Sequence, residues 1–202
     1  MGLKQRLKQH ISTNRWQYGV ITIIFIIALI MGNYRVQSLE GGVKNHLAGL
    51  IDTYLQEGGM GALTGQQLLV GAFLNQVRTA LAIWFLGLTI IGFPLILAVL
   101  FYRGFSLGFT VGFLIHQKSG AGVLISILSV LPQNLVYIPA LLIWAVISLN
   151  FSIYIFRGRG ADALSWRSFM SYTFMLLFFI LIFLSGAFIE AFLSPWFLKI
   201  LL

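Results

Sequence analysis

The sequence predicts an all-α polytopic membrane protein with about five transmembrane helices, because long apolar segments recur along a short chain that carries few charges. Of the 202 residues, 59% are hydrophobic and 9% are charged, and the mean hydropathy is +0.94. Residues 18–31 and 79–102 contain no charged side chain. A helix of about 20 such residues crosses the roughly 30 Å hydrocarbon core of a bilayer. Several runs of this kind cannot all be buried in a soluble domain this small, so we expect one integral membrane domain over residues 1–202.

The charge balance points to membrane insertion rather than to nucleic acid. The chain has 13 Lys and Arg against 5 Asp and Glu, a formal net charge of +8. These basic residues lie mostly between the apolar runs, which is typical of the positive-inside bias of membrane proteins. Without cysteine, the sequence excludes disulfides, thiolate metal sites and thiol nucleophiles.

The first predicted span is residues 18–36, after a basic amphipathic lead at residues 1–16 that suits cytoplasmic lipid headgroups. No small-x-small cleavage pattern follows the apolar run, so we expect a retained helix rather than a signal peptide. The N-terminus is then cytoplasmic.

Residues 37–74 form the one sizeable loop, and their slightly negative charge favours the outer side of the membrane. Apolar residues recur here at helical spacing and polar residues take the opposite face, which predicts an amphipathic helix ending at Gly58-Gly59. Such a helix lies flat on the membrane surface, docks a partner protein, or does both. For partner contact we expect Leu47, Leu50 and Tyr54.

The second predicted span is residues 75–101, kinked at Pro94, with Arg103 in a cytoplasmic turn after it. Residues 104–132 hold two short apolar pieces around the break at 116–122, either one broken crossing or a re-entrant hairpin. The basic break Arg157-Gly158-Arg159 is expected to be cytoplasmic. Because Arg103 is also expected to be cytoplasmic, an even number of crossings must lie between these two basic sites. One of them is the span at 135–156, so residues 104–132 must supply the other, and we predict an interrupted third span. Spans at 135–156 and 169–193 follow, with the C-terminus outside.

No constellation in the sequence predicts catalysis, a metal or a cofactor. The three histidines lie in separate segments without zinc-site spacing, and no phosphate-binding glycine motif is present. We therefore expect a protein that is not an enzyme and needs no cofactor.

Glu190 is the one acidic residue in or near a span, where a charge is costly and suggests a function. We expect a structural hydrogen bond to Arg35 or Arg78, with a proton relay or a partner contact as alternatives.

Three glycines spaced four apart, Gly104, Gly108 and Gly112, line one helix face. This spacing lets a neighbouring helix approach closely. The neighbour is either another span of this chain or the single span of another protein.

Three segments carry a family resemblance. The first is 73–78 (FLNQVR) followed by Gly87, 92–94, 103–104 and Gly108; the second is 131–140 (LPQNLVYIPA); and the third is 186–195 (GAFIEAFLSP). Together they resemble the stage II sporulation protein M family over nearly the whole chain. Many wider relatives carry His-Gly and a Glu where this chain has Gln133-Asn134 and Tyr137, so any polar role of those residues does not transfer directly.

The resemblance implies a non-enzymatic membrane scaffold in the mother-cell membrane at the sporulation septum. It would recruit and anchor the peptidoglycan hydrolases called stage II sporulation proteins P and D, whose wall cleavage drives forespore engulfment. A homo-oligomer is compatible with this role. The alternative from another class is a small transporter or channel subunit with its site around residues 116–122, since broken helices often line substrate sites.

Overall fold

The computed structural model describes residues 5, 9, 11–56, 64–159 and 165–201. Within these ranges the regular structure is entirely helical. The elements are α2 (Arg15–Gln37), α3 (Gly41–Gln56), α4 (Gly65–Gly87), α5 (Gly92–Ile125), α6 (Leu131–Tyr154), α8 (Trp166–Phe188), α9 (Ser194–Leu201) and three π-helical turns, η1 (Ser126–Val130), η2 (Ile155–Arg159) and η3 (Ile189–Leu193).

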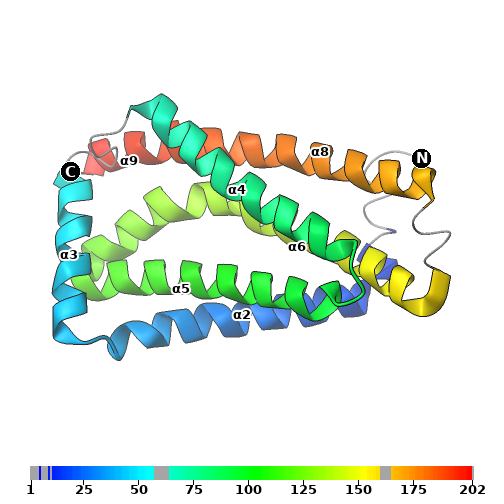
Figure 1. Ribbon diagram of the computed structural model, residues 1–202. Helices are drawn as coiled ribbons and strands as arrows, with labels where there is room; N and C mark the ends of the chain where they lie inside the picture. Colours follow the sequence, from blue (N-terminus) through cyan, green and yellow to red (C-terminus); the bar gives the residue numbers. More distant parts are fainter. Residues whose placement is uncertain (1–4, 6–8, 10, 57–63, 160–164, 202) are drawn as a thin grey trace.

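Five helical stretches are long and apolar enough to cross a membrane: Arg15–Gln37, Gly65–Gly87, Gly92–Lys118, Gly120–Arg157 and Trp166–Leu198. They run back and forth between two ends of the molecule, and α3 lies across one of these ends (Figure 1). The predicted all-α membrane fold with about five spans is confirmed.

The boundaries of the second predicted span are wrong. Helix α4 ends at Gly87 and α5 begins at Gly92, so a turn interrupts residues 75–101. In this turn a Cβ on Gly92 would overlap the carbonyl oxygen of Leu86, and the Thr89 hydroxyl donates to that same oxygen at 2.8 Å. Pro94 falls in the first turn of α5, where backbone N–H groups have no intrahelical acceptor. The absence of an N–H on proline therefore costs no helical hydrogen bond there. It therefore begins a helix instead of kinking one.

The third span is also continuous, contrary to the prediction. It occupies Gly92–Lys118, and the chain reverses at its end. A Cβ on Gly122 would overlap the carbonyl oxygen of Leu114, although eight residues of straight helix rise about 12 Å. Residues 116–122 are thus a sharply bent, helical part of α5 that joins the third and fourth spans, neither a broken crossing nor a re-entrant hairpin.

The irregularity lies instead in the fourth span, at η1. Pro132 follows η1 at the start of α6, and a proline ring clashes with the carbonyl four residues earlier in a regular helix. The wider π-helical turn relieves this clash. Serine and glutamine side chains beside it face the protein interior, which matters for the site below.

Small residues let α2 and α5 pack with their backbones in contact. A Cβ on Gly108 would overlap the carbonyl oxygen of Leu29, and one on Gly104 would lie 2.8 Å from that of Phe25. At Gly112, Asn33 of α2 occupies the space that a Cβ would need. Helix α2 thus occupies the face that these three glycines form, and the span of another protein would have to displace α2 to reach it.

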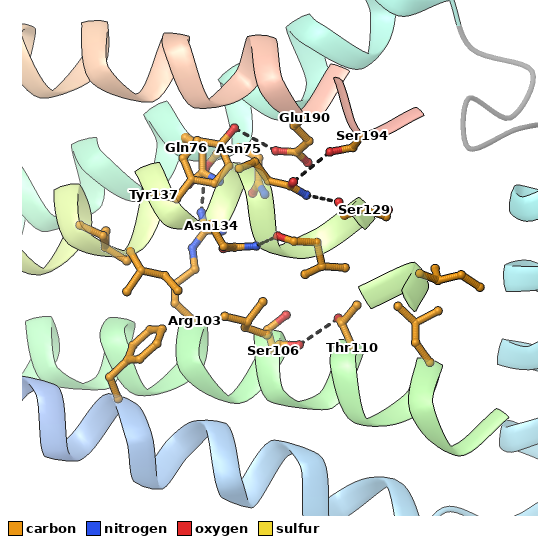
Figure 2. Close-up of a pocket in the computed structure, with 18 of the residues that line it drawn as sticks. Asn75, Gln76, Arg103, Ser106, Thr110, Ser129, Asn134, Tyr137, Glu190 and Ser194 are labelled. Carbon is orange, nitrogen blue, oxygen red and sulfur yellow. Dashed lines mark hydrogen bonds between the residues drawn. The ribbon is translucent and has the colours of Figure 1, made fainter. Parts of the chain in front are cut away.

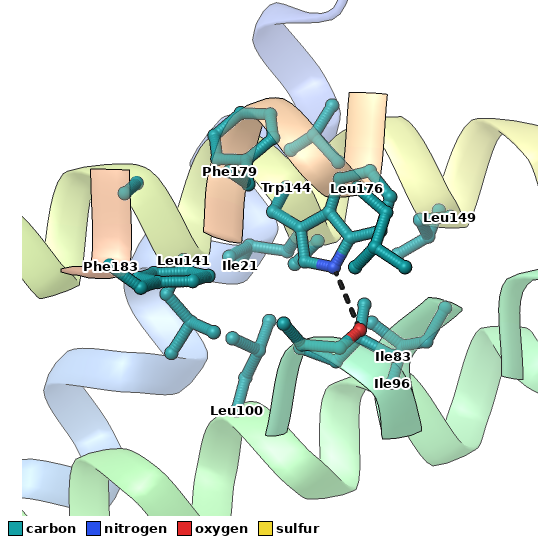
Figure 3. Close-up of a cluster of buried hydrophobic side chains, with 14 of the residues drawn as sticks. Ile21, Ile83, Ile96, Leu100, Leu141, Trp144, Leu149, Leu176, Phe179 and Phe183 are labelled. Carbon is teal, nitrogen blue, oxygen red and sulfur yellow. Dashed lines mark hydrogen bonds between the residues drawn. The ribbon is translucent and has the colours of Figure 1, made fainter. Parts of the chain in front are cut away.

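The core lies between α4, α6 and α8 and is centred on Trp144, which is 0% exposed (Figure 3). Its indole Nε1 donates to the carbonyl oxygen of Ala80 at 3.1 Å. Its ring stacks on Tyr172 at 5.3 Å between centroids and packs against Phe179. One side chain thereby joins three spans.

Candidate functional site

Polar side chains gather in a cavity of about 450 Å³ between α4, α5, α6 and η3 (Figure 2). A volume of this size is typical of small-ligand sites. Polar groups within membrane spans are expensive and mark candidate sites. The polar residues of the lining are Asn75, Gln76, Arg103, Ser106, Thr110, Ser129, Gln133, Asn134, Tyr137, Glu190 and Ser194.

Arg103 projects into this cavity from near the middle of the third span, Gly92–Lys118. Its Nη2 donates to the carbonyl oxygen of Asn75 at 3.0 Å and to the hydroxyl of Thr79. Helix α4 therefore holds the guanidinium in place. The prediction that Arg103 lies in a turn is wrong, because the turn between the second and third spans lies at residues 88–91 and Arg103 lies within α5.

Glu190 lies on the other side of the cavity, in η3. The hydroxyl of Tyr137 donates to its Oε2 at 2.9 Å. The tyrosine ring fits there because residue 186 is glycine, and a Cβ at that position would overlap the ring. The predicted structural hydrogen bond is present, but its donor is Tyr137 and not Arg35 or Arg78.

A hydrogen-bonded wall closes the side of the cavity formed by η1 and the start of α6. Gln133 donates from Nε2 to the carbonyl oxygen of Ser129 at 2.6 Å, and its Oε1 accepts from the hydroxyl of Ser194 at 2.9 Å. These three residues are buried. Their polar groups are bonded to one another, so they fix the wall's geometry.

The charged groups of the cavity do not form a direct ion pair. Among the described residues, the one ion pair joins Lys118 to Asp52 at 2.6 Å. Arg103 and Glu190 therefore line one cavity as separated opposite charges. The same part of the chain holds no cluster of three or more potential metal-ligating side chains.

The family model for stage II sporulation protein M matches residues 21–195. The chain belongs to this family. No curated protein and no solved structure matches it. The resemblance that the sequence predicts is confirmed, and it identifies a sporulation-related membrane protein.

In this stage II sporulation protein M family member, the three segments that carry the resemblance meet at the cavity. Asn75 and Gln76 come from the first segment, which also contains Arg103; Gln133 and Tyr137 come from the second; Glu190 and Ser194 come from the third. Residues more than 100 positions apart in the sequence thus build one site. This convergence makes the cavity the principal candidate site of the family fold in this chain.

The predicted amphipathic helix is present as α3 and lies across one end of the spans (Figure 1). Ile51 packs with Leu114 and Leu198, and Asp52 pairs with Lys118. Leu50 is 56% exposed, whereas Leu47 is half-buried. The side chain of Tyr54 lies outside the described residues, so its predicted contact stays a prediction, as do those of Leu47 and Leu50.

Of the cavity residues, only Glu190 was among the predicted site residues. Arg103 was missed because the second span was placed across the α4–α5 turn, which moved this residue out of the membrane. The other lining residues share no local pattern, because tertiary contacts bring them together. Thr89 and Gly92 are the local signals for the α4–α5 turn, but apolar neighbours surround them.

We expect Tyr137→Phe to destabilise the protein by about 1–3 kcal/mol, since it removes the only hydrogen bond given to the Glu190 carboxylate by the described residues. Thermal unfolding in mild detergent measures this loss. Tyr102→Phe on α5 is the matched control, because Tyr102 is 68% exposed. Equal melting temperatures for the two variants would contradict a structural role for this hydrogen bond.

Proposed function

We propose that this sporulation-related membrane protein is a non-enzymatic scaffold that recruits and anchors peptidoglycan hydrolases at the sporulation septum. Family membership supports stage II sporulation proteins P and D as the partners, through the resemblance described above. In this role the protein positions wall cleavage that drives forespore engulfment, and the hydrolases perform the chemistry.

The observation that carries the proposal is the position of α3. The helix contacts the bundle through Ile51 and the partly exposed Asp52–Lys118 pair, while Leu50 remains exposed. An amphipathic helix that lies across the end of the spans presents an apolar face to a membrane-anchored partner.

The distribution of basic residues supports an outer position for α3. Arg15, Arg157 and Arg167 gather at the opposite end of the spans, where α2 and α8 begin (Figure 1). By the positive-inside rule this end faces the cytoplasm. We accordingly propose a cytoplasmic N-terminus, with α3 and the C-terminal end of α9 on the side of the cell wall.

Replacing Leu47 and Leu50 together by Asp should reduce hydrolase recovery about tenfold or more, as expected for loss of an interface hot spot. The measurement is affinity purification of the tagged full-length protein from solubilised membranes of sporulating cells. Quantitative mass spectrometry then compares the recovered wall hydrolases with the amount of scaffold.

The matched control is Asn45→Asp with Gly49→Asp, which adds the same charge to the opposite face of α3. Both positions are exposed, and a Cβ on Gly49 meets nothing within 4 Å. Equal hydrolase recovery with both double variants would contradict a role for the Leu47–Leu50 face. Purification of the native chain without any hydrolase would contradict the scaffold itself.

The transporter alternative placed its site at residues 116–122. That segment is the bent part of α5 beside α3, and its Lys118 pairs with Asp52. A broken helix at mid-membrane depth, which motivated the alternative, is absent from this described segment, and we do not carry that site forward.

A further inference from the structure

The separated charges of the cavity have no role in the scaffold proposal. Charged side chains in membrane spans normally pair with one another or face a water-filled cavity. Arg103 and Glu190 face the same cavity from α5 and η3 without a direct ion pair among the described residues. Two opposite charges that line one cavity form a complementary site for a molecule that carries both signs.

Each charge is held in a way that leaves donors or acceptors for a ligand. The hydrogen bonds of Arg103 to described residues use Nη2 alone, which leaves Nε and Nη1 as donors. Those of Glu190 use Oε2 alone, which leaves Oε1 as an acceptor. Thr79 and Tyr137 thus orient the two charged groups and leave their remaining donors and acceptor available to a ligand.

The cavity is accessible from the surface of the bundle. Asn75 on α4 and Ser106 and Thr110 on α5 line it and are exposed. In Figure 2, Ser106 and Thr110 lie opposite Asn134, Tyr137 and Glu190. The side chain of Arg103 reaches from α5 into the space between these two groups. A small polar group therefore has a route in between α4 and α5, and a cavity of about 450 Å³ holds a headgroup-sized molecule.

We propose that this cavity binds a small zwitterion, whose anionic group pairs with Arg103 and whose primary ammonium pairs with Glu190. Guanidinium donors suit phosphate and carboxylate oxygens, and an ammonium supplies the N–H donors that a carboxylate accepts. A phosphoethanolamine lipid headgroup and a free amino acid share this chemistry. Helix α3 contributes Ile51 to the lining, whereas Leu47 and Leu50, the residues replaced to test the scaffold proposal, do not line the cavity.

Lipid retention by the full-length protein tests the proposal. The protein is purified in mild detergent and incubated with equal amounts of phosphatidylethanolamine and phosphatidylglycerol, and bound lipid is counted by native mass spectrometry. We expect the native chain to retain the ethanolamine lipid about tenfold over the glycerol lipid, as one charge-assisted contact to Glu190 predicts.

Glu190→Gln should abolish this preference while phosphatidylglycerol still binds, because the neutral amide no longer favours an ammonium or repels an anion. Arg103→Gln should reduce retention of both lipids about tenfold. Arg78→Gln is the matched control, since Arg78 is exposed on α4 and does not line this cavity. Should Arg103→Gln fail to fold, the selectivity change in the near-isosteric Glu190→Gln variant still decides.

Soluble competitors distinguish the two sources of the zwitterion. Displacement of the lipid by phosphoethanolamine or glycine supports a site for free solutes, whereas displacement by neither, with the ethanolamine preference intact, supports a lipid headgroup. The proposal is overturned if the native chain and Glu190→Gln show the same lipid selectivity and neither soluble compound protects the native chain against thermal unfolding. Hydrolase recovery plays no part in these readouts, so this outcome and failure of the scaffold proposal are separable.

Discussion

Replacement of Gly108 by Leu is expected to destabilise the folded protein by about 3 kcal/mol or more, the upper range for overpacking a close-packed site. Even a Cβ at this position would overlap the carbonyl oxygen of Leu29, and a backbone atom cannot move aside as a flexible side chain can. The variant must therefore push α2 away from α5. Close backbone approach at small residues is a main source of helix association in membranes, so this separation also weakens the contacts at Gly104 and Gly112.

Thermal unfolding of the purified variant in mild detergent, followed by size-exclusion chromatography, measures this loss. Gly71→Leu is the matched control, because Gly71 lies on α4 and a Cβ there meets nothing within 4 Å. A Gly108→Leu protein as stable as the control would contradict the α2–α5 contact. Any loss of partner recovery in this variant must be compared with its loss of folded protein, since α2 covers the glycine face.

Truncation of Trp144 to Ala is expected to cost about 3–5 kcal/mol, the usual range for removing a buried aromatic side chain. The indole is completely buried and contacts Tyr172 and Phe179 of α8, and it donates to the carbonyl oxygen of Ala80 on α4. In a bilayer the loss comes from packing and hydrogen bonding, because lipid tails are as apolar as the core. Three spans lose their common contact at once.

The same thermal assay tests this prediction, with Trp166→Ala as the matched control, since Trp166 is 75% exposed. Trp144→Phe separates the two contributions, because it keeps an aromatic ring for stacking and removes the Nε1 donor. We expect its stability to fall between those of the native chain and Trp144→Ala. Native-like stability of Trp144→Ala would exclude this residue as the centre of the core.

The fold class, the number of spans and the amphipathic helix α3 were predictable from the sequence. Apolar length and helical periodicity report these features directly, and they do not depend on which helices contact one another. The glycine spacing at 104, 108 and 112 likewise predicted a close helix approach, which the contact with Leu29 of α2 provides. The sequence could not show whether the neighbour is a span of this chain or the span of another protein, because a transmembrane helix of either kind packs on a glycine face in the same way.

The turn at residues 88–91 and the cavity were not predictable in the same way. Ile90 and Ile91 are apolar and exposed, so in hydropathy the turn continues the spans on either side. The cavity depends on tertiary contacts that bring Arg103, Tyr137 and Glu190 together from three helical segments. A shift of one span boundary was enough to assign Arg103 to the surface and to leave Glu190 with the wrong partners.

The pairing of α2 with α5 also imposes an order of events on synthesis in the cell. Helix α2 is complete at Gln37, but the third span that fills its small-residue face ends at Lys118, 81 residues later (118 − 37). At about 5–20 residues per second, translation takes roughly 4–16 s to cover that interval. During those seconds the space beside Gly32 that the Phe105 carbonyl oxygen later occupies is still empty. Helix α2 therefore has to remain beside the insertion machinery or stand alone in lipid until α5 emerges.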